Sequence, residues 1–119
     1  NLMSSSLARS VRITNAKEFA HVFNKGRHSQ SQFWKIVISR SASSFSRLGL
    51  AISKKEYKRA VDRNHLKRLA RETFRLNQDC LGDLDYVVMA KKNDCNNNAE
   101  VMLDLLSLMK KAKNRIAPE

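Results

Sequence analysis

Basic residues at helical spacing are the part of this sequence with the clearest chemistry. Cations recur at intervals of four residues at Arg63, Lys67, Arg71 and Arg75. On an α-helix this spacing places them along one side, and Asn64 and Arg68 flank them. Such like charges repel one another, and Glu72 is the only acidic residue near the row to offer i,i+4 compensation. Phosphates would turn the repulsion into attraction. The row therefore predicts binding of a phosphate backbone, with a solvated helix face as the alternative.

The other side of the same stretch is apolar, which predicts an amphipathic helix over residues 58–77. Its apolar side is made of Val61, Leu66, Leu69, Ala70, Thr73 and Leu76. Further cations precede the helix at Lys54, Lys55, Lys58 and Arg59 and extend the basic patch. The helix therefore has one side for a protein core and one side for a polyanion.

The charge of the whole chain agrees with such a surface. The 119 residues include 23 Lys and Arg against 11 Asp and Glu, a formal net charge of +12. All of this excess lies in residues 1–75, since residues 76–119 are close to neutral. A one-sided excess favours nucleic acid as the partner, with an acidic membrane surface or an acidic protein as alternatives.

Composition narrows the class of protein further. A chain of this length with 42% hydrophobic residues forms one domain, 1–119, of which residues 1–11 are expected to be flexible. The longest apolar run is too short to cross a bilayer, and the first residues do not resemble a signal peptide. Two cysteines form neither a metal motif nor a disulfide framework. We expect a cytoplasmic protein with no membrane contact.

Three helices and three strands are expected to position the basic row. A first helix is expected to begin after Asn15, the N-cap residue, with Glu18 at the N3 position of a capping box. This helix is expected to end at Gly26 in the left-handed conformation. Alternating residues predict strands over 33–40 and 47–53, close enough in sequence to pair as an antiparallel hairpin. A third strand covers 85–91. A last helix follows the possible caps at residues 96–98, with an apolar stripe of Met102, Leu105, Met109, Ala112 and Ile116.

These elements predict an α+β fold in the order α-β-β-α-β-α. We expect a single small domain, a two-layer sandwich of one mainly antiparallel sheet with helices packed on it.

A motif in the basic helix resembles a known family. The segment 53–75, with Ser53-Lys54-Lys55 followed by Arg63-Asn64-His65-Leu66-Lys67-Arg68-Leu69 and Arg71, closely resembles the signature of the bacterial ribonuclease P protein subunit. Residues 17–26, 47–53 and 85–91 resemble other parts of that family, so the resemblance covers 12–115. The family has Arg where His65 stands, and His65 is as compatible with a hydrogen-bonded flank position as with an RNA contact.

The resemblance implies that the protein acts together with an RNA subunit. In this family the catalyst is an RNA subunit, which uses Mg²⁺ to remove the 5′ leader of precursor tRNA, and the protein assists. The chain would then be part of an endoribonuclease, with catalytic RNA and precursor tRNA as its partners and no obligate protein partner. We expect the RNA subunit to bind the Mg²⁺ and the protein to have no metal site.

The resemblance also implies two binding surfaces. The catalytic RNA would contact Lys54, Lys55, Arg59, Arg63, Asn64, His65, Lys67, Arg68, Arg71 and Arg75. The leader would contact a groove between the first helix and the sheet, lined by Arg12, Lys17, Phe19, Phe23, Trp34, Lys35 and Arg47. Aromatic side chains among cations are typical of grooves for single-stranded RNA. Core packing stays the alternative for Phe19, Phe23 and Trp34.

A catalytic site on the protein itself is not expected. The acidic residues around the third strand match no metal-binding spacing, and the three histidines have no partner pattern. The rival hypothesis is a stand-alone DNA- or RNA-binding module. Such a module would read bases with several amide side chains, whereas Asn64 is the only amide in the row.

Overall fold

The structure is a computed structural model that describes residues 12–40, 45–93 and 97–116. Its elements in chain order are α1 (Ala16–Lys25), β1 (Arg27–Gln30), β2 (Trp34–Arg40), β3 (Arg47–Leu50), α2 (Ala60–Leu76), the short 3-10 helix η3 (Gln78–Cys80), β4 (Leu84–Ala90) and α3 (Asn98–Ile116). The predicted α+β class and element order are confirmed, with β1 added. Strand β1 was not predicted, because Arg-His-Ser-Gln has no apolar alternation. The expected flexible segment 1–11 lies outside the described residues.

The four strands form one mixed sheet in the order β1-β2-β4-β3. The β1–β2 and β2–β4 pairs are antiparallel, whereas β3 runs parallel to β4. The predicted hairpin between the strands at 33–40 and 47–53 is therefore wrong, because β4 lies between them. The apolar residues of β4 are buried on both faces, which a central position in the sheet provides. Because β3 and β4 are parallel and follow one another as strands, the chain must cross over between them, and α2 forms this crossover.

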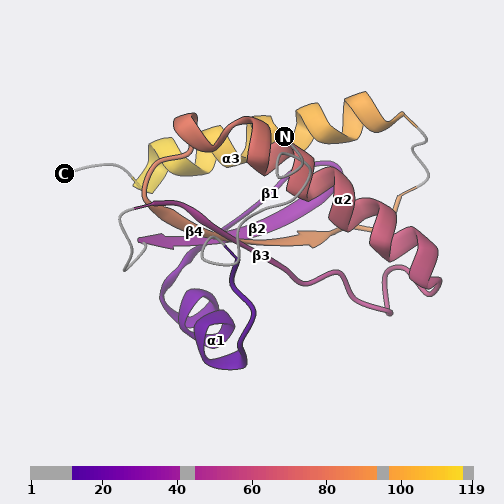
Figure 1. The fold of residues 1–119 in the computed structure, drawn as a ribbon, viewed down its shortest axis with the longest axis horizontal. Coiled ribbons are helices and arrows are strands. Elements are labelled where there is room, and N and C mark those ends of the chain that lie inside the picture. Colours follow the sequence, from indigo (N-terminus) through magenta and orange to yellow (C-terminus); the bar gives the residue numbers. More distant parts are fainter. Residues whose placement is uncertain (1–11, 41–44, 94–96, 117–119) are drawn as a thin grey trace, which may run out of the picture.

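Helices cover both faces of the sheet, so the fold has three layers where two were expected (Figure 1). Helices α2 and α3 pack on the face formed by the even-numbered residues of β2 and β4, which include Trp34, Ile36 and Tyr86. On the other face Val37 and Val87 form a smaller core with Ile13 and with Val22 of α1. Helix α1 lies under one half of the sheet, and no other described helix covers the rest of this face, which we call its open half (Figure 1).

The starts of α1 and α3 follow local capping signals, whereas two residues of the predicted apolar side of α2 are exposed. Asn15 accepts a hydrogen bond from the Glu18 backbone N–H at 2.9 Å, and Asn97 accepts one from Glu100 at 3.0 Å. These bonds confirm the predicted caps of the first and last helices. The apolar side of α2 was predicted too long, because Val61 and Leu76 are 58% and 63% exposed. They lie in the terminal turns of the helix.

Gly26 ends α1 in extended backbone, with φ −86° and ψ 168°. The predicted left-handed conformation is wrong. Glycine is required there for space, since an added Cβ would lie 2.5 Å from the Val22 carbonyl oxygen and 2.6 Å from that of Ile38. The lack of a side chain lets the end of α1 approach β2.

Replacing Gly26 by alanine should therefore destabilise the protein. We expect the free energy of unfolding to fall by about 1–3 kcal/mol, the usual cost of overpacking. Chemical denaturation measures this, with Asn24→Ala on the exposed side of α1 as control. An unchanged midpoint for the Gly26 variant would show that α1 can move away from β2 at no cost.

Candidate nucleic-acid interface

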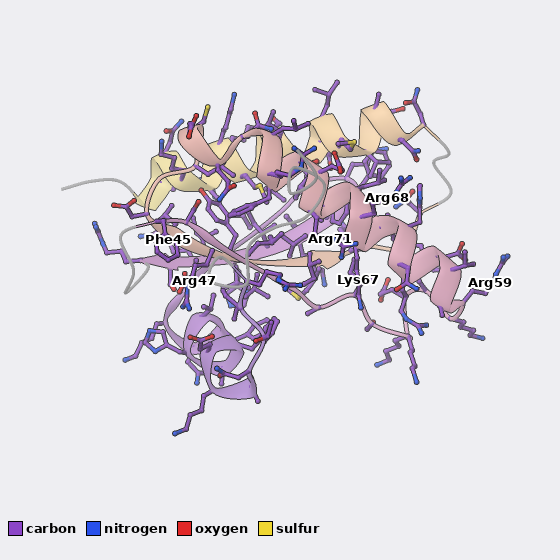
Figure 2. The ribbon with its side chains drawn as sticks, viewed as in Figure 1. Phe45, Arg47, Arg59, Lys67, Arg68 and Arg71 are labelled. Atoms are coloured by element: carbon purple, nitrogen blue, oxygen red, sulfur yellow. The ribbon has the colours of Figure 1, made fainter. Side chains whose placement is uncertain are left out.

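Three cations in the middle of α2 have no hydrogen-bond or ion-pair partner among the described residues. They are Lys67, Arg68 and Arg71, and Figure 2 shows them along the helix with Arg59 beyond its first turn. Arg68 is exposed, whereas Lys67 and Arg71 are half-buried. Their charges are available to an external anion.

Other cations of the row are partly engaged within the protein. Nη1 of Arg63 donates to the carbonyl oxygens of Tyr57 and Lys58 at 2.9 and 2.8 Å, which holds the chain leading into α2. Arg75 pairs with Glu72 at 2.9 Å, and Arg59 lies 3.8 Å from Asp62. The sequence placed Arg63 and Arg75 in the row and Arg59 just before it, but the structure leaves the unpartnered charge in the centre of the row.

The remaining residues predicted for this surface lie at its margins. Lys54 and Lys55 are exposed in the turn after β3, and Asn64 is exposed in the second turn of α2. His65 is half-buried, and its Nε2 lies 2.9 Å from Oδ1 of Asn98 in the first turn of α3. Of the two roles left open for His65, the structure shows the hydrogen-bonded flank position, which ties α2 to α3.

The open half of the α1 face is hollowed into a trough. One hollow of about 400 Å³ is lined by Lys35, Ala51, Ser53, Glu56, Met89, Ala90, Lys91 and Lys92. A second of about 460 Å³ is lined by His28, Ser29, Gln30, Lys35, Ile36, Met89 and Arg115. The two hollows adjoin at Lys35 and Met89, and together they follow β4, β2 and β1. We call the pair the sheet trough.

Hydrogen bonds stiffen one rim of the sheet trough. The Lys91 ammonium donates to the Ser31 carbonyl oxygen at 2.9 Å, and the Tyr57 hydroxyl donates to the Lys91 carbonyl oxygen at 2.8 Å. The Lys92 backbone N–H donates to the Glu56 carboxylate at 3.0 Å. These bonds join the segments that follow β3 and β4 to the β1–β2 turn, while the Lys35 and Lys92 side chains stay exposed.

Some residues predicted for the leader groove do lie at the sheet trough. Lys35 lines both hollows. Phe23 is half-buried beside His28, with ring centroids 6.4 Å apart, and His28 lines the second hollow. Lys17 is exposed on α1. Phe23 packs against the smaller core with part of its side chain, as the alternative stated, and the rest of the side chain is exposed.

The leader-binding prediction for Trp34 is wrong. Its side chain is fully buried on the opposite face of the sheet, and its indole N–H donates to the Val101 carbonyl oxygen of α3 at 2.9 Å. Trp34 shares a face with Ile36 and Ile38, and the structure turns that face toward α3. The indole is part of the main core.

Arg47 is not a free cation for a leader. Its guanidinium donates twice to the Asp85 carboxylate and once to Glu18, each at 2.9 Å, and its side chain is 14% exposed between the sheet and α1 (Figure 2). The hydrogen bonds to Asp85 raise the pKa of Arg47 against the opposing effect of burial, and Glu18 adds to the rise. Arg47 therefore joins α1 to β3 and β4.

Arg12 and Phe19 lie at a different hollow, on the edge of the sheet next to α2. The chain before α1 runs beside β3, where the Ile13 N–H donates to the Leu48 carbonyl oxygen at 2.8 Å. The hollow has a volume of about 290 Å³ and is lined by Arg12, Ile13, Thr14, Phe19, Leu48, Leu50, Lys67 and Arg71. We call it the β3-side groove.

Sequence reasoning missed several lining residues of the sheet trough. Met89, Lys91, Lys92 and Arg115 come from β4, the segment after it and the end of α3. Alternation along β4 puts Met89 on the face opposite the main core, which was the available signal. The pairing of β2 with β4 decides that Met89 meets Lys35, and that pairing was not predicted.

Metal-ligand clusters and membrane-spanning helices are both absent from residues 12–40, 45–93 and 97–116. No group of three or more His, Cys, Asp or Glu side chains there is arranged to hold a metal ion. No helix there is long and apolar enough to cross a bilayer.

Comparison with known proteins identifies the family. The family model described as Ribonuclease P matches residues 7–113. The chain belongs to the ribonuclease P protein family. The ribonuclease P protein component of Methylococcus capsulatus is 46% identical over 99 residues, covering 82% of this chain and 77% of that protein. That of Vesicomyosocius okutanii is 38% identical over 109 residues, covering 92% and 96%.

Solved structures agree on the fold. An RNase P protein mutant of Staphylococcus aureus with defective mRNA degradation activity superposes with a TM-score of 0.82, at 26% identity over 94% of this chain and 92% of that one. As a ribonuclease P protein, the chain is a subunit of a ribonucleoprotein endoribonuclease that acts in tRNA 5′ processing and has RNA as its catalyst. The stand-alone DNA- or RNA-binding module is thereby set aside.

Proposed function

We propose that the chain binds the catalytic RNA through the middle of α2 and the 5′ leader of precursor tRNA through the sheet trough. Lys67, Arg68 and Arg71 would neutralise phosphates of the RNA subunit, and the trough would hold the single-stranded leader. The protein thereby positions the leader relative to the RNA that cleaves it, within the cytoplasm.

The unpartnered cations of α2 support the first part. A guanidinium or ammonium that already has a carboxylate partner gains less from a phosphate than a free one does, because its existing pair must break. Lys67, Arg68 and Arg71 have no partner among the described residues, and Glu72 is already bonded to Arg75. The centre of α2 is therefore the strongest phosphate site on the helix.

The open half of the α1 face supports the second part of the proposal, binding of the leader. A single strand exposes both unstacked bases and phosphates, so its groove needs apolar surface beside cations. The sheet trough has Met89 and Ala51 as apolar floor, with Lys35, Lys92 and Arg115 around it. Phe23 lies at the α1 side, close to His28. These residues fit a single strand better than a duplex.

The hydrolysis itself we assign to the RNA subunit, with the required Mg²⁺ bound mainly there. The described residues offer no carboxylate cluster for the ion. The protein's side chains would bind and orient the RNA.

Reconstitution tests the proposal. The protein is added to a cognate catalytic RNA at low Mg²⁺, and leader removal from precursor tRNA is assayed. We expect cleavage only when both subunits are present, because the protein's cations stand in for part of the screening that high Mg²⁺ supplies. Cleavage by the protein alone would contradict the division of labour.

The leader part makes its own prediction at Phe23. Phe23→Ala should weaken holoenzyme binding of precursor tRNA by about 1–3 kcal/mol, the usual contribution of a base–aromatic stack, and should leave mature tRNA binding unchanged. Filter binding of both substrates measures this, with His21→Ala on the exposed side of α1 as control. Equal losses on both substrates would show that Phe23 serves only the fold.

A further inference from the structure

Tyr57 lies in the segment between β3 and α2 and fastens it to the chain that follows β4. Its ring is half-buried against the main core. Its hydroxyl donates to the Lys91 carbonyl oxygen at 2.8 Å and accepts from Nδ2 of Asn93 at 3.0 Å. The same Nδ2 also donates to the Lys91 carbonyl oxygen, at 3.0 Å. We call these three residues, joined by three hydrogen bonds, the Tyr57 clip.

The Tyr57 clip continues into hydrogen bonds on both sides. Toward the sheet trough, the Lys91 ammonium donates to the Ser31 carbonyl oxygen at 2.9 Å, and the Ser31 hydroxyl donates to the Asp104 carboxylate of α3. Toward α2, Nη1 of Arg63 donates to the Tyr57 carbonyl oxygen at 2.9 Å. The bonds therefore lead from α3, along the rim of the sheet trough, to the first turn of α2.

Helix α2 depends on these bonds because its N-cap residue cannot cap it. Arg59 carries only donors, so its side chain cannot accept from the free N–H groups of the first turn. In α1 and α3, Asn15 and Asn97 supply that acceptor. Residues 51–59 contain neither helix nor strand. The start of α2 is therefore held to the sheet through Arg63 and the Tyr57 clip.

The spacing between α2 and the sheet trough matters for the proposed function. The RNA subunit on α2 and the leader in the trough belong to one assembly, so the leader meets Lys35 and Lys92 only when the trough keeps its place relative to α2. A loose rim would become ordered each time a leader bound, and the lost entropy would reduce the affinity. A rim that is bonded beforehand avoids that loss.

We propose that Tyr57 is a positioning residue for the leader: its hydroxyl holds the rim of the sheet trough in a fixed place relative to α2. Tyr57 is not among the residues that line the two hollows. It acts through Lys91 and Arg63 rather than by contact with RNA. This inference rests on the proposed function and adds that the affinity for the leader depends on a side chain outside the lining of the trough.

Tyr57→Phe tests the role, because it removes the hydroxyl and keeps the ring. In the holoenzyme reconstituted with a cognate catalytic RNA, we expect the affinity for precursor tRNA to fall about three- to tenfold, the usual effect of one lost hydrogen bond. The affinity for mature tRNA should stay at the wild-type value, because mature tRNA has no leader. Binding of the RNA subunit alone should also be unchanged, since the apolar side of α2 holds the centre of that helix.

Tyr86→Phe is the matched control. The Tyr86 hydroxyl also donates to a main-chain carbonyl oxygen, that of Leu81, at 2.6 Å, but it is buried in the main core. We expect this variant to be less stable and to keep the wild-type ratio of precursor to mature tRNA affinity. A Tyr57→Phe protein that loses affinity equally for both tRNAs would show that the hydroxyl serves only the fold, and the positioning role would be wrong.

Tyr57→Leu distinguishes positioning from direct contact. If Tyr57→Phe binds precursor tRNA like the wild type and only Tyr57→Leu binds it less tightly, the ring itself contacts RNA and the proposal is overturned. If both variants show the same selective loss, the hydroxyl accounts for the effect and the proposal stands.

Lys35→Gln separates failure of this inference from failure of the leader site. If Lys35→Gln weakens binding of precursor tRNA selectively and Tyr57→Phe does not, the leader site stands and the positioning role is wrong. If neither variant lowers the ratio of precursor to mature tRNA affinity, the leader does not lie in the sheet trough, and the positioning role is contradicted together with it.

Discussion

Replacing Arg47 by alanine is expected to lower the free energy of unfolding by about 3–5 kcal/mol. The guanidinium is 14% exposed and Asp85 only 3%, and two hydrogen bonds of 2.9 Å join them. Without Arg47 the Asp85 carboxylate would stay buried in the sheet with no opposite charge. Glu18 would also lose its bond to Arg47, and with it one contact between α1 and β3.

Denaturant unfolding distinguishes the interaction energy of the Arg47–Asp85 pair from the contribution of either side chain alone. The four proteins compared are wild type, Arg47→Ala, Asp85→Asn and the double variant. The double variant should be less destabilised than the two single losses predict, because removing both partners leaves no unpaired charge. Arg75→Ala is the matched control, since its bond to Glu72 is equally short but its two side chains are more exposed, at 27% and 35%, and exposed pairs contribute about 0–1 kcal/mol. Equal losses at Arg47 and Arg75 would contradict the structural role of Arg47.

The helices α1, α2 and α3 and the strands β2, β3 and β4 could be predicted from sequence because their signals are local. The caps at Asn15 and Asn97 and the apolar periodicities of α2 and α3 depend on residues within a few positions of one another. Strand pairing is not local. The short loop after β2 suggested a hairpin with β3, yet β4 takes the place between them because its side chains need burial on both faces. Alternation shows which residues share a face, but not which layer covers it.

The difference between local and non-local signals also explains which part of the candidate site could be predicted. The α2 surface lies on one helix, so residue spacing was enough to place Lys67, Arg68 and Arg71 together. The sheet trough joins Lys35 of β2 to Met89 of β4 and Arg115 of α3, which meet only through the tertiary fold. Trp34 was misplaced for that reason. The engagement of Arg63 and Arg47 within the protein was also hidden, since their partners are backbone oxygens and distant carboxylates.

One segment links the two surfaces physically. Ser53 and Glu56 line the sheet trough, while Lys54 and Lys55 between them are exposed and lead toward α2. Glu56 and Tyr57 are bonded to the segment that follows β4, and Arg63 of α2 holds the Tyr57 carbonyl oxygen. An RNA docked on α2 would therefore lie next to the trough, which is the arrangement needed to present a leader to its catalyst.

Neutralising Lys67, Arg68 and Arg71 together by glutamine is expected to weaken binding of the RNA subunit by about 100-fold at physiological salt. Each lost phosphate contact lowers the slope of log affinity against log salt by about 0.7–0.9, so the three together should lower it by roughly 2–3. The fold should be kept, since none of the three side chains bonds to another described residue.

The matched control removes the same three charges elsewhere, at Lys25, Lys110 and Lys111, which are exposed on α1 and α3. Both variants have the same net charge, so a long-range effect of charge alone would weaken binding equally in both. A docked surface predicts a large change in the salt slope for the α2 variant and a small one for the control. Equal slopes would mean that the basic excess attracts RNA without a defined face, and the α2 surface would lose its role. Unequal slopes would locate the phosphate contacts on the centre of α2, the part of the helix where the structure leaves the positive charge uncompensated.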